Sequence, residues 1–385
     1  MPLTQVTSIE SHFANLTDPR IDRTKKHKLL DIIVIAICAT ICGADGFVAV
    51  QAFGKAKFDW FATFLQLPFG IPSHDTFGRV FAALDPKQFQ HCFFSWTSAV
   101  SSLCEGEIVP IDGKQLKRSY NNEDGKAAVH LVSAWSSANG LALGQVKVAE
   151  KSNEITAIPQ LLDILNINGC IVTIDAMGTQ KQIAKKIVEQ QADYVLALKK
   201  NQGQLYEDVC LLFDDLQQNP ATSLYDECCV DSAQTIEKDH GRIETRKAIT
   251  LSGQDCISSL RNAPSFANFK TVVKVTCERD INDNVGVESR YYISSLDSTA
   301  EKLLDATRTH WGIENCVHWI LDVGFGEDYC RIRKGNAAEN FAILRRIALN
   351  LLKAENSVKL GTANKRLNAG WDNDYLMKVL STLFH

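Results

Sequence analysis

The order of the apolar runs between residues 107 and 198 constrains the fold most strongly. Strands are predicted where short apolar runs stand between turn signals, at 107–111, 127–135, 141–148, 171–174 and 194–198. Asn139-Gly140 is a typical tight turn between antiparallel strands. Helical apolar spacing occupies 155–165 and 179–190. The order predicts three strands joined by short turns, then parallel strands reached through helical crossovers. This is an α/β fold with a mixed sheet flanked by helices.

The sequence on either side of this region has a different pattern. Residues 1–105 show helical or mixed apolar spacing broken by Pro and Gly, which predicts a helical N-terminal domain. After Lys199 the alternation stops, and strand-like runs at 242–251, 270–277 and 289–295 predict a β-rich insertion over about 200–298. Strong helical patterns follow at 301–323 and 336–354. We therefore expect an α/β domain over 106–355, interrupted by the insertion, and a C-terminal tail over 356–385.

Overall charge and cysteine usage bound the class of protein. The net charge of −4 argues against binding of nucleic acid through total charge, but local patches matter more. One such patch lies in residues 18–28, which contain Arg20, Arg23, Lys25, Lys26 and Lys28. The 12 cysteines are scattered, and no signal peptide is visible, so we expect reduced thiols in a cytoplasmic protein. The most apolar run, 32–42, is shorter than the about twenty residues of a membrane-spanning helix.

Two aspartates follow apolar strands in similar settings. Asp112 comes after 107–111 and Asp175 after 171–174, and a glycine lies close behind each. Sites in open α/β sheets form beyond the carboxyl ends of the strands, so neighbouring strands would bring the two carboxylates together. Such a pair repels unless a cation lies between its members, and Mg²⁺ prefers oxygen ligands. The alternative is that both aspartates only cap turns.

A third carboxylate is available in the helical pattern at 301–323. Glu314 follows the apolar Ile313 and would lie at the edge of the buried face, whereas Asp322, Glu327 and Asp328 are other acids nearby. His310, Glu314 and His318 are spaced four apart and would share one helical face, which is an alternative zinc-binding arrangement.

Basic residues near these acids are candidates for phosphate contact, since Lys and Arg dominate binding to nucleic-acid backbones. They are Lys114, Lys117, Arg118, Lys199, Lys200, Arg242, Arg246, Arg308, His310, Arg331, Arg333 and Lys334, together with Arg20, Arg23, Lys25 and Lys26 in the N-terminal region. Arg242, Glu244 and Arg246 would face one way on a strand, next to His240. The alternative is that many of these charges are only solvated surface groups.

Several stretches together resemble a known family. They are DPRIDRTKKHKLLDIIVIAICATICGADGF, GIPSHDTFGRVF, PIDGKQLKRS, TIDAMGTQ, YVLALKKNQ, HGRIETR and HWGIENCVHWILDVGFGEDYCRIRKGNAAENFAILRRIALNLL, in this order from about residue 10 to 355. The sequence resembles bacterial insertion-sequence transposases of the DDE type, in particular the group of H-repeat-associated proteins. The resemblance implies an RNase H-like catalytic core over 106–355.

The resemblance also implies a function and a site. Asp112, Asp175 and Glu314 match the family's catalytic acids, which would hold two Mg²⁺ or Mn²⁺ ions for cleavage and strand transfer of DNA. The expected partners are double-stranded DNA at terminal inverted repeats and target sites, and a second copy of the chain. The wider superfamily carries Tyr-x2-Arg-x3-Glu-x6-Lys, but Thr307, His310 and Leu321 stand in place of its Tyr, Arg and Lys. A catalytically inactive or domesticated DNA-binding copy and another RNase H-like nuclease are the alternatives.

Overall fold

The computed structural model describes residues 11–101, 103–120, 125, 127–149, 152–219, 228–239, 241–281 and 284–381. Its centre is one sheet of nine strands in the order β3-β2-β1-β4-β5-β9-β8-β7-β6. The first five are β1 (Ile108–Gln115), β2 (His130–Trp135), β3 (Ala142–Lys147), β4 (Ile171–Ile174) and β5 (Asp193–Leu198). β1, β2 and β3 pair antiparallel, whereas β1, β4 and β5 pair parallel. The predicted mixed α/β sheet is confirmed.

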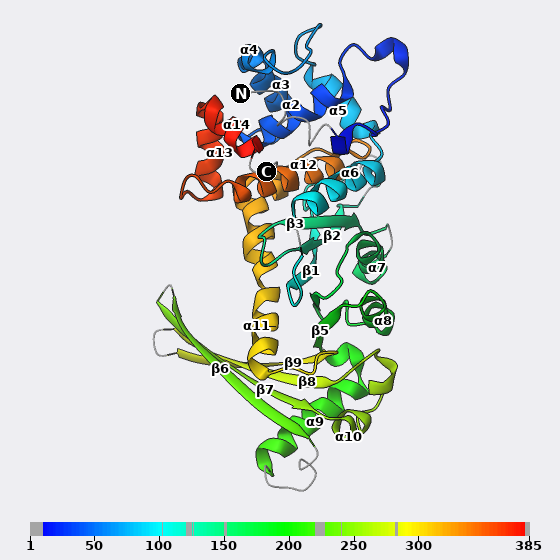
Figure 1. Ribbon diagram of the computed structural model, residues 1–385, viewed down its shortest axis with the longest axis vertical. Coiled ribbons are helices and arrows are strands. Elements are labelled where there is room, and N and C mark those ends of the chain that lie inside the picture. Colours follow the sequence, from blue (N-terminus) through cyan, green and yellow to red (C-terminus); the bar gives the residue numbers. More distant parts are fainter. Residues whose placement is uncertain are drawn as a thin grey trace.

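The insertion extends this sheet instead of forming a sheet of its own. Its strands are β6 (Cys229–Asp239), β7 (Arg242–Ser252), β8 (Thr271–Ile281) and β9 (Asn284–Ser294), all antiparallel. β9 pairs with β5, with Ile293 opposite Leu196. Figure 1 shows the four strands as a curved ribbon at one end of the molecule. The sequence prediction missed β6, because the run CVDSAQTIEKD is largely polar and exposed.

Helices cover both faces of the sheet (Figure 1). On one face, α7 (Glu154–Ile164) packs on β2 and β3 and α8 (Lys181–Glu189) on β5, through a core that contains Leu161, Ile183 and Val172. α9 (Gln204–Gln218) and α10 (Gln254–Ser258) continue this core over the insertion. On the other face, α11 (Ala300–His310) buries Leu303 and Leu304 in a separate cluster with strand residues. α11 therefore crosses this face of the sheet, against β1 and β4 of the core and β6 and β7 of the insertion.

The N-terminal helices share one core with the C-terminal helices. The first group is α2 (Leu29–Ile41), α3 (Phe47–Ala56), α4 (Phe58–Phe61), α5 (His74–Ala83) and α6 (Pro86–Val100); the second is α12 (Ala337–Ala354), α13 (Thr362–Trp371) and α14 (Asn373–Ser381). α12 is buried from Ala337 to Leu352 and lies between the sheet and α2. Residues 356–381, expected to belong to a tail, thus include two packed helices. The three-part domain division itself stays a prediction.

The apolar run 32–42 is explained by this core. Every α2 residue from Asp31 to Ile41 is buried, so the helix is surrounded by other helices. No helix within the described ranges is long and apolar enough to cross a membrane. Ser73 begins α5, where its hydroxyl accepts a hydrogen bond from the Thr76 amide at 3.3 Å.

Candidate active site

Asp112 and Asp175 lie at equivalent positions on neighbouring strands. Ile111 of β1 stands opposite Ile174 of β4 in the parallel pair, and each aspartate is the next residue. The strand predicted over 107–111 is too short, because β1 continues past Asp112 to Gln115. β2 still pairs with this part of β1, with Ser133 opposite Asp112, so the ladder holds β1 extended after β4 has ended.

Asp175 also caps the turn that follows it. Its Oδ1 accepts hydrogen bonds from the amides of Met177, at 3.0 Å, and Gly178, at 3.2 Å. A Cβ at residue 178 would collide with Ile174 and lie 2.8 Å from Ile158 Cδ1, so only glycine fits this close approach. The capping interpretation is therefore compatible with a position beside Asp112, and the turn fixes the direction of the Asp175 carboxylate.

Glu314 comes from the other side of the sheet. The prediction of a regular helix over 301–323 is only partly right, since α11 ends at His310. The chain continues in π-helical turns over Glu314–His318 (η6) and Ile320–Gly324 (η7). π-helical turns occur often at functional sites. Gly312 packs directly on the Trp135 ring, where a Cβ would lie 2.7 Å from Cζ3. This close approach brings the turns down onto β1 and β2.

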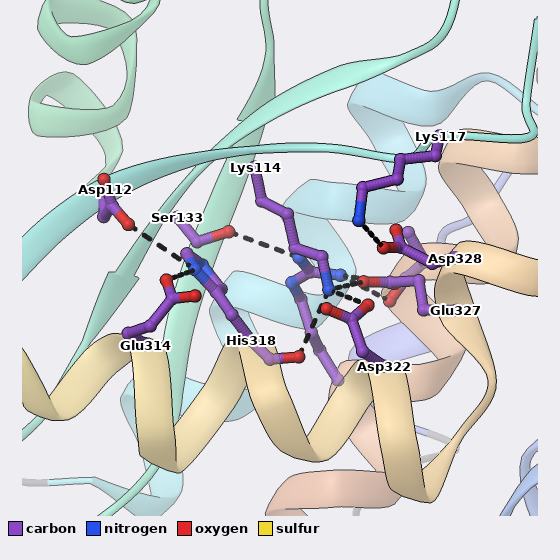
Figure 2. A network of polar contacts seen from close by, with 11 residues as sticks. Asp112, Lys114, Lys117, Ser133, Glu314, His318, Asp322, Glu327 and Asp328 are labelled. Atoms are coloured by element: carbon purple, nitrogen blue, oxygen red, sulfur yellow. Dashed lines mark hydrogen bonds and ion pairs between the residues drawn. The ribbon is translucent and has the colours of Figure 1, made fainter.

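His318 connects the acids of β1 and η6 (Figure 2). Its Nδ1 lies 3.2 Å from Glu314 Oε2 and 3.5 Å from Asp112 Oδ2, and the residue is 3% exposed. Ligand-type atoms of Asp112, Glu314 and His318 all lie within 4.8 Å of one another. His310 is not part of this group, because its Nδ1 faces Thr173 Oγ1 at 3.0 Å. His310, Glu314 and His318, the alternative zinc-binding face, therefore do not lie together as one group.

Burial and neighbouring charges shape the titration of these groups. Burial raises the pKa of Asp112 above its ordinary value, and the negative charge of Asp175 adds to the rise. The hydrogen bond from His318 lowers the pKa of Glu314. Burial lowers the pKa of His310, which favours its neutral form. A cation beside Asp112 would therefore stabilise its ionised form.

All three predicted acids line one cavity of about 530 Å³. Its wall also carries polar and cationic side chains, among them Lys199, Lys200, Tyr206, Arg290 and His310. The cavity lies between the ends of β1, β4 and β5, the end of α11, and β9, which is the insertion strand next to β5. Three segments far apart in the sequence therefore deliver carboxylates to one space.

A buried ion network beside the acids was not foreseen. Lys114 Nζ pairs with Asp322, lies 3.2 Å from Glu327 Oε2 and donates to the His318 carbonyl at 3.2 Å (Figure 2). Lys114 is 9% exposed. This placement is at odds with the DNA contact expected for Lys114. Its ammonium instead holds β1, two residues from Asp112, against the π-helical turns that carry Glu314.

Glu327 is the centre of this network. It is 1% exposed, and its Oε1 lies 3.3 Å from Nη1 of Arg346 in α12, whose Nη2 donates to Ser133 Oγ at 3.3 Å. Burial opposes ionisation of Glu327, but the positive charges of Arg346 and Lys114 outweigh it and lower the pKa to about 2. Lys117 and Asp328 add a pair at 2.6 Å nearer the surface. The only signal in the sequence was the group of acids Asp322, Glu327 and Asp328.

The remaining basic candidates lie outside the acid cluster. Arg242 pairs with the buried Glu244 at 3.0 Å, Arg246 with Glu237 and Glu244, and Arg308 with Glu237. These three arginines line a second cavity, of about 610 Å³. His240 lies outside the described residues.

Other candidates pair locally or stand at the surface. Arg20 pairs with Asp18 at 2.7 Å and Lys25 with Asp22 at 2.8 Å, whereas Arg333 Nε donates to the Arg118 carbonyl at 3.0 Å. The residues whose side chains are exposed include Arg23, Lys26, Lys199, Lys200, Arg331 and Lys334. Their role in phosphate contact stays a prediction.

A mixed sheet that brings three acids to one cavity is the arrangement expected of an RNase H-like core. The chain belongs to the family of DDE transposases: the model "Transposase DDE domain" matches residues 76–351, and the model "DDE_Tnp_1-associated" matches 10–97. It is 38% identical over 384 residues to the "H repeat-associated putative transposase YhhI" of Escherichia coli K12, covering 98% of both chains. It is also 38% identical to the "Putative transposase YncI" of Escherichia coli O157:H7, over 98% of this chain and 95% of that one. A structure of the piggyBac transposase synaptic complex with hairpin DNA aligns with a TM-score of 0.41 and 12% identity, over 98% of this chain and 76% of that chain.

Proposed function

We propose that this protein is a transposase that cuts and joins DNA at the inverted repeats of an insertion sequence by metal-dependent phosphoryl transfer. The single observation that carries the proposal is that Asp112, Asp175 and Glu314 line one cavity although they come from three distant segments. Membership of the DDE transposase family supports the same assignment.

The donor set fits divalent metal ions. Carboxylate oxygens are the ligands that Mg²⁺ and Mn²⁺ prefer, and the site presents them from two adjacent strands and one helical turn. Asp112 is half-buried beside Asp175, and a cation there would stabilise its ionised form. We assign Asp112, Asp175 and Glu314 as the ligands of two such ions. The ions would supply activation of the attacking oxygen and neutralisation of charge on the phosphate.

The chain itself would position the reacting groups. Phosphoryl transfer needs in-line alignment more than covalent help from the protein. The Asp175 turn and the Lys114 network fix the carboxylates on both sides of the cavity. Lys199 and Lys200, at the end of β5, are exposed on the cavity wall, where they would contact the phosphates of double-stranded DNA. The arginines of the second cavity and the basic residues of 18–28 would extend this surface.

We further propose that a homodimer holds the two DNA ends and that the protein acts in the cytoplasm. Two ends must be joined in one reaction, which requires two sites at one place.

An assay that separates cutting from joining tests the function. The probes are linear duplexes taken from both flanks of the gene, a supercoiled plasmid as target, and Mg²⁺ or Mn²⁺. A transposase produces both nicked ends and plasmid-joined products. Cutting without joining would identify another RNase H-like nuclease, and neither reaction would identify an inactive DNA-binding copy; each result would overturn the proposal.

A further inference from the structure

His318 stands where a ligand of the metal site would stand, although it is not one of the family's three acids. It lies four residues after Glu314 in the same π-helical turn, with Nδ1 aimed at both Glu314 and Asp112 (Figure 2). We propose that His318 Nδ1 is a ligand, with Asp112 and Glu314, of one of the divalent ions, and that this nitrogen makes the position prefer Mn²⁺ over Mg²⁺. The inference rests on the proposed function and deepens it.

The distances are those of ligands that share one ion. Octahedral coordination with bonds of about 2.1 Å places neighbouring ligand atoms about 3 Å apart. Nδ1 is 3.2 Å from Glu314 Oε2 and 3.5 Å from Asp112 Oδ2, so these three side chains would be able to hold one ion together.

The surroundings of His318 hold the ring in this orientation. The side chain is 3% exposed, and the His318 carbonyl accepts a hydrogen bond from Lys114. Nε2 is buried and has no hydrogen-bond partner among the described residues. Neither tautomer therefore gains a hydrogen bond at Nε2. An ion would replace the hydrogen bond between Nδ1 and Glu314: the ring proton would then lie on Nε2, and the Nδ1 lone pair would face the ion.

The nitrogen has a consequence for metal choice. Mg²⁺ takes oxygen ligands and water almost always, whereas imidazole favours the transition metals. Mn²⁺ takes carboxylate oxygen as Mg²⁺ does, but as a transition metal it accepts imidazole nitrogen more readily than Mg²⁺. A site made of Asp112, Glu314 and His318 therefore discriminates against Mg²⁺ relative to one made of carboxylates alone.

Electron spin echo spectroscopy of the full-length protein loaded with Mn²⁺ tests the assignment. A coordinated imidazole gives a ¹⁴N modulation that carboxylates and water do not give. We expect bound Mn²⁺ with this modulation in the wild type, its loss in His318→Gln, and its retention in the matched control His310→Gln. We also expect the ratio of Mn²⁺ to Mg²⁺ affinity to fall on the order of tenfold in His318→Gln.

If His318→Gln fails to fold, the wild-type spectrum and that of His310→Gln still test the role of His318. Bound Mn²⁺ without ¹⁴N modulation, or modulation that only His310→Gln removes, overturns the role of His318 and leaves the acid site intact. Absence of any bound Mn²⁺ overturns the inference and the proposed metal site together. An unchanged affinity ratio in folded His318→Gln also overturns the preference for Mn²⁺.

Discussion

Replacing Glu327 with Gln tests whether the buried ion network holds the active site together. The substitution keeps the size of the side chain and removes the negative charge that Lys114 and Arg346 share. Arg346 would then be buried without its acidic partner, and Lys114 would keep only Asp322, which is costly in a protein interior. We expect Glu327→Gln to weaken folding and to loosen the turns that carry Glu314.

The magnitude follows from the position of Glu327. Its pKa falls from the ordinary 4.5 to about 2, a shift equivalent to about 3 kcal/mol of stabilisation. Removal of one partner from a buried pair typically costs about 3–5 kcal/mol. We therefore expect Glu327→Gln to lower the free energy of unfolding by about 3 kcal/mol at pH 7. Because the folded pKa is depressed, this contribution is complete above pH 4.5 and disappears as the pH falls toward 2.

Urea denaturation followed by circular dichroism measures the effect. The matched control is Lys117→Gln, because the Lys117 side chain is 73% exposed in its pair with Asp328, and an exposed ion pair contributes little to stability. A loss below about 1 kcal/mol in Glu327→Gln, or an equal loss in both variants, would refute the view that Glu327 anchors the site.

Two further predictions concern residues next to the acids. Gly178→Ala should destabilise the fold by about 1–3 kcal/mol, because the added Cβ would meet Ile174 and Ile158. Thermal denaturation measures the effect, and Gly286→Ala, whose Cβ would meet nothing within 4 Å, is the control. Equal melting temperatures of the two variants would be evidence against the tight turn. Burial raises the pKa of Glu154 to about 7, and the charges of Asp175 and Asp112 add to the rise. Because this pKa is raised in the folded state, the wild type loses stability as the pH rises from 4.5 through 7. In metal-free buffer, the free energy of unfolding of Glu154→Gln should therefore exceed that of the wild type by roughly 1–2 kcal/mol at pH 8 and by little at pH 4.5. A difference that does not depend on pH would contradict this.

The central sheet was predictable because its signals are local. The runs at 171–174 and 194–198 are short, apolar and bounded by turns, and they are β4 and β5 almost to the residue. β6 was not predictable, since its exposed polar residues gain their conformation from pairing with β7. The insertion joins the central sheet through pairing of β5 with β9, which are about 95 residues apart. The periodicity of the sequence gives no information on such a distant contact.

The site divides in the same way. The positions of Asp112 and Asp175 after matching strands were enough to predict their meeting, although the continuation of β1 to Gln115 depends on β2. The spacing of Glu314 and His318 was visible in the sequence. Periodicity does not distinguish a π-helical turn from a regular helix, so the sequence could not show that His310 lies apart from these two residues. The burial of Lys114 depends on Glu327 and Arg346, which come from a loop and a distant helix. From the sequence alone, Lys114 looks like an exposed lysine that could contact a phosphate.

Cleavage of DNA by the acid variants tests the central claim most directly. Purified wild type, Asp112→Asn, Asp175→Asn and Glu314→Gln are each incubated with end-labelled duplex from the flanks of the gene and with Mg²⁺ or Mn²⁺, and nicked product is measured over time. Glu301→Gln, an exposed change on α11, is the control. The account predicts metal-dependent cleavage by wild type and the control, and a loss of at least about a hundredfold in each acid variant. Cleavage at the wild-type rate by any one of the three folded variants would contradict it.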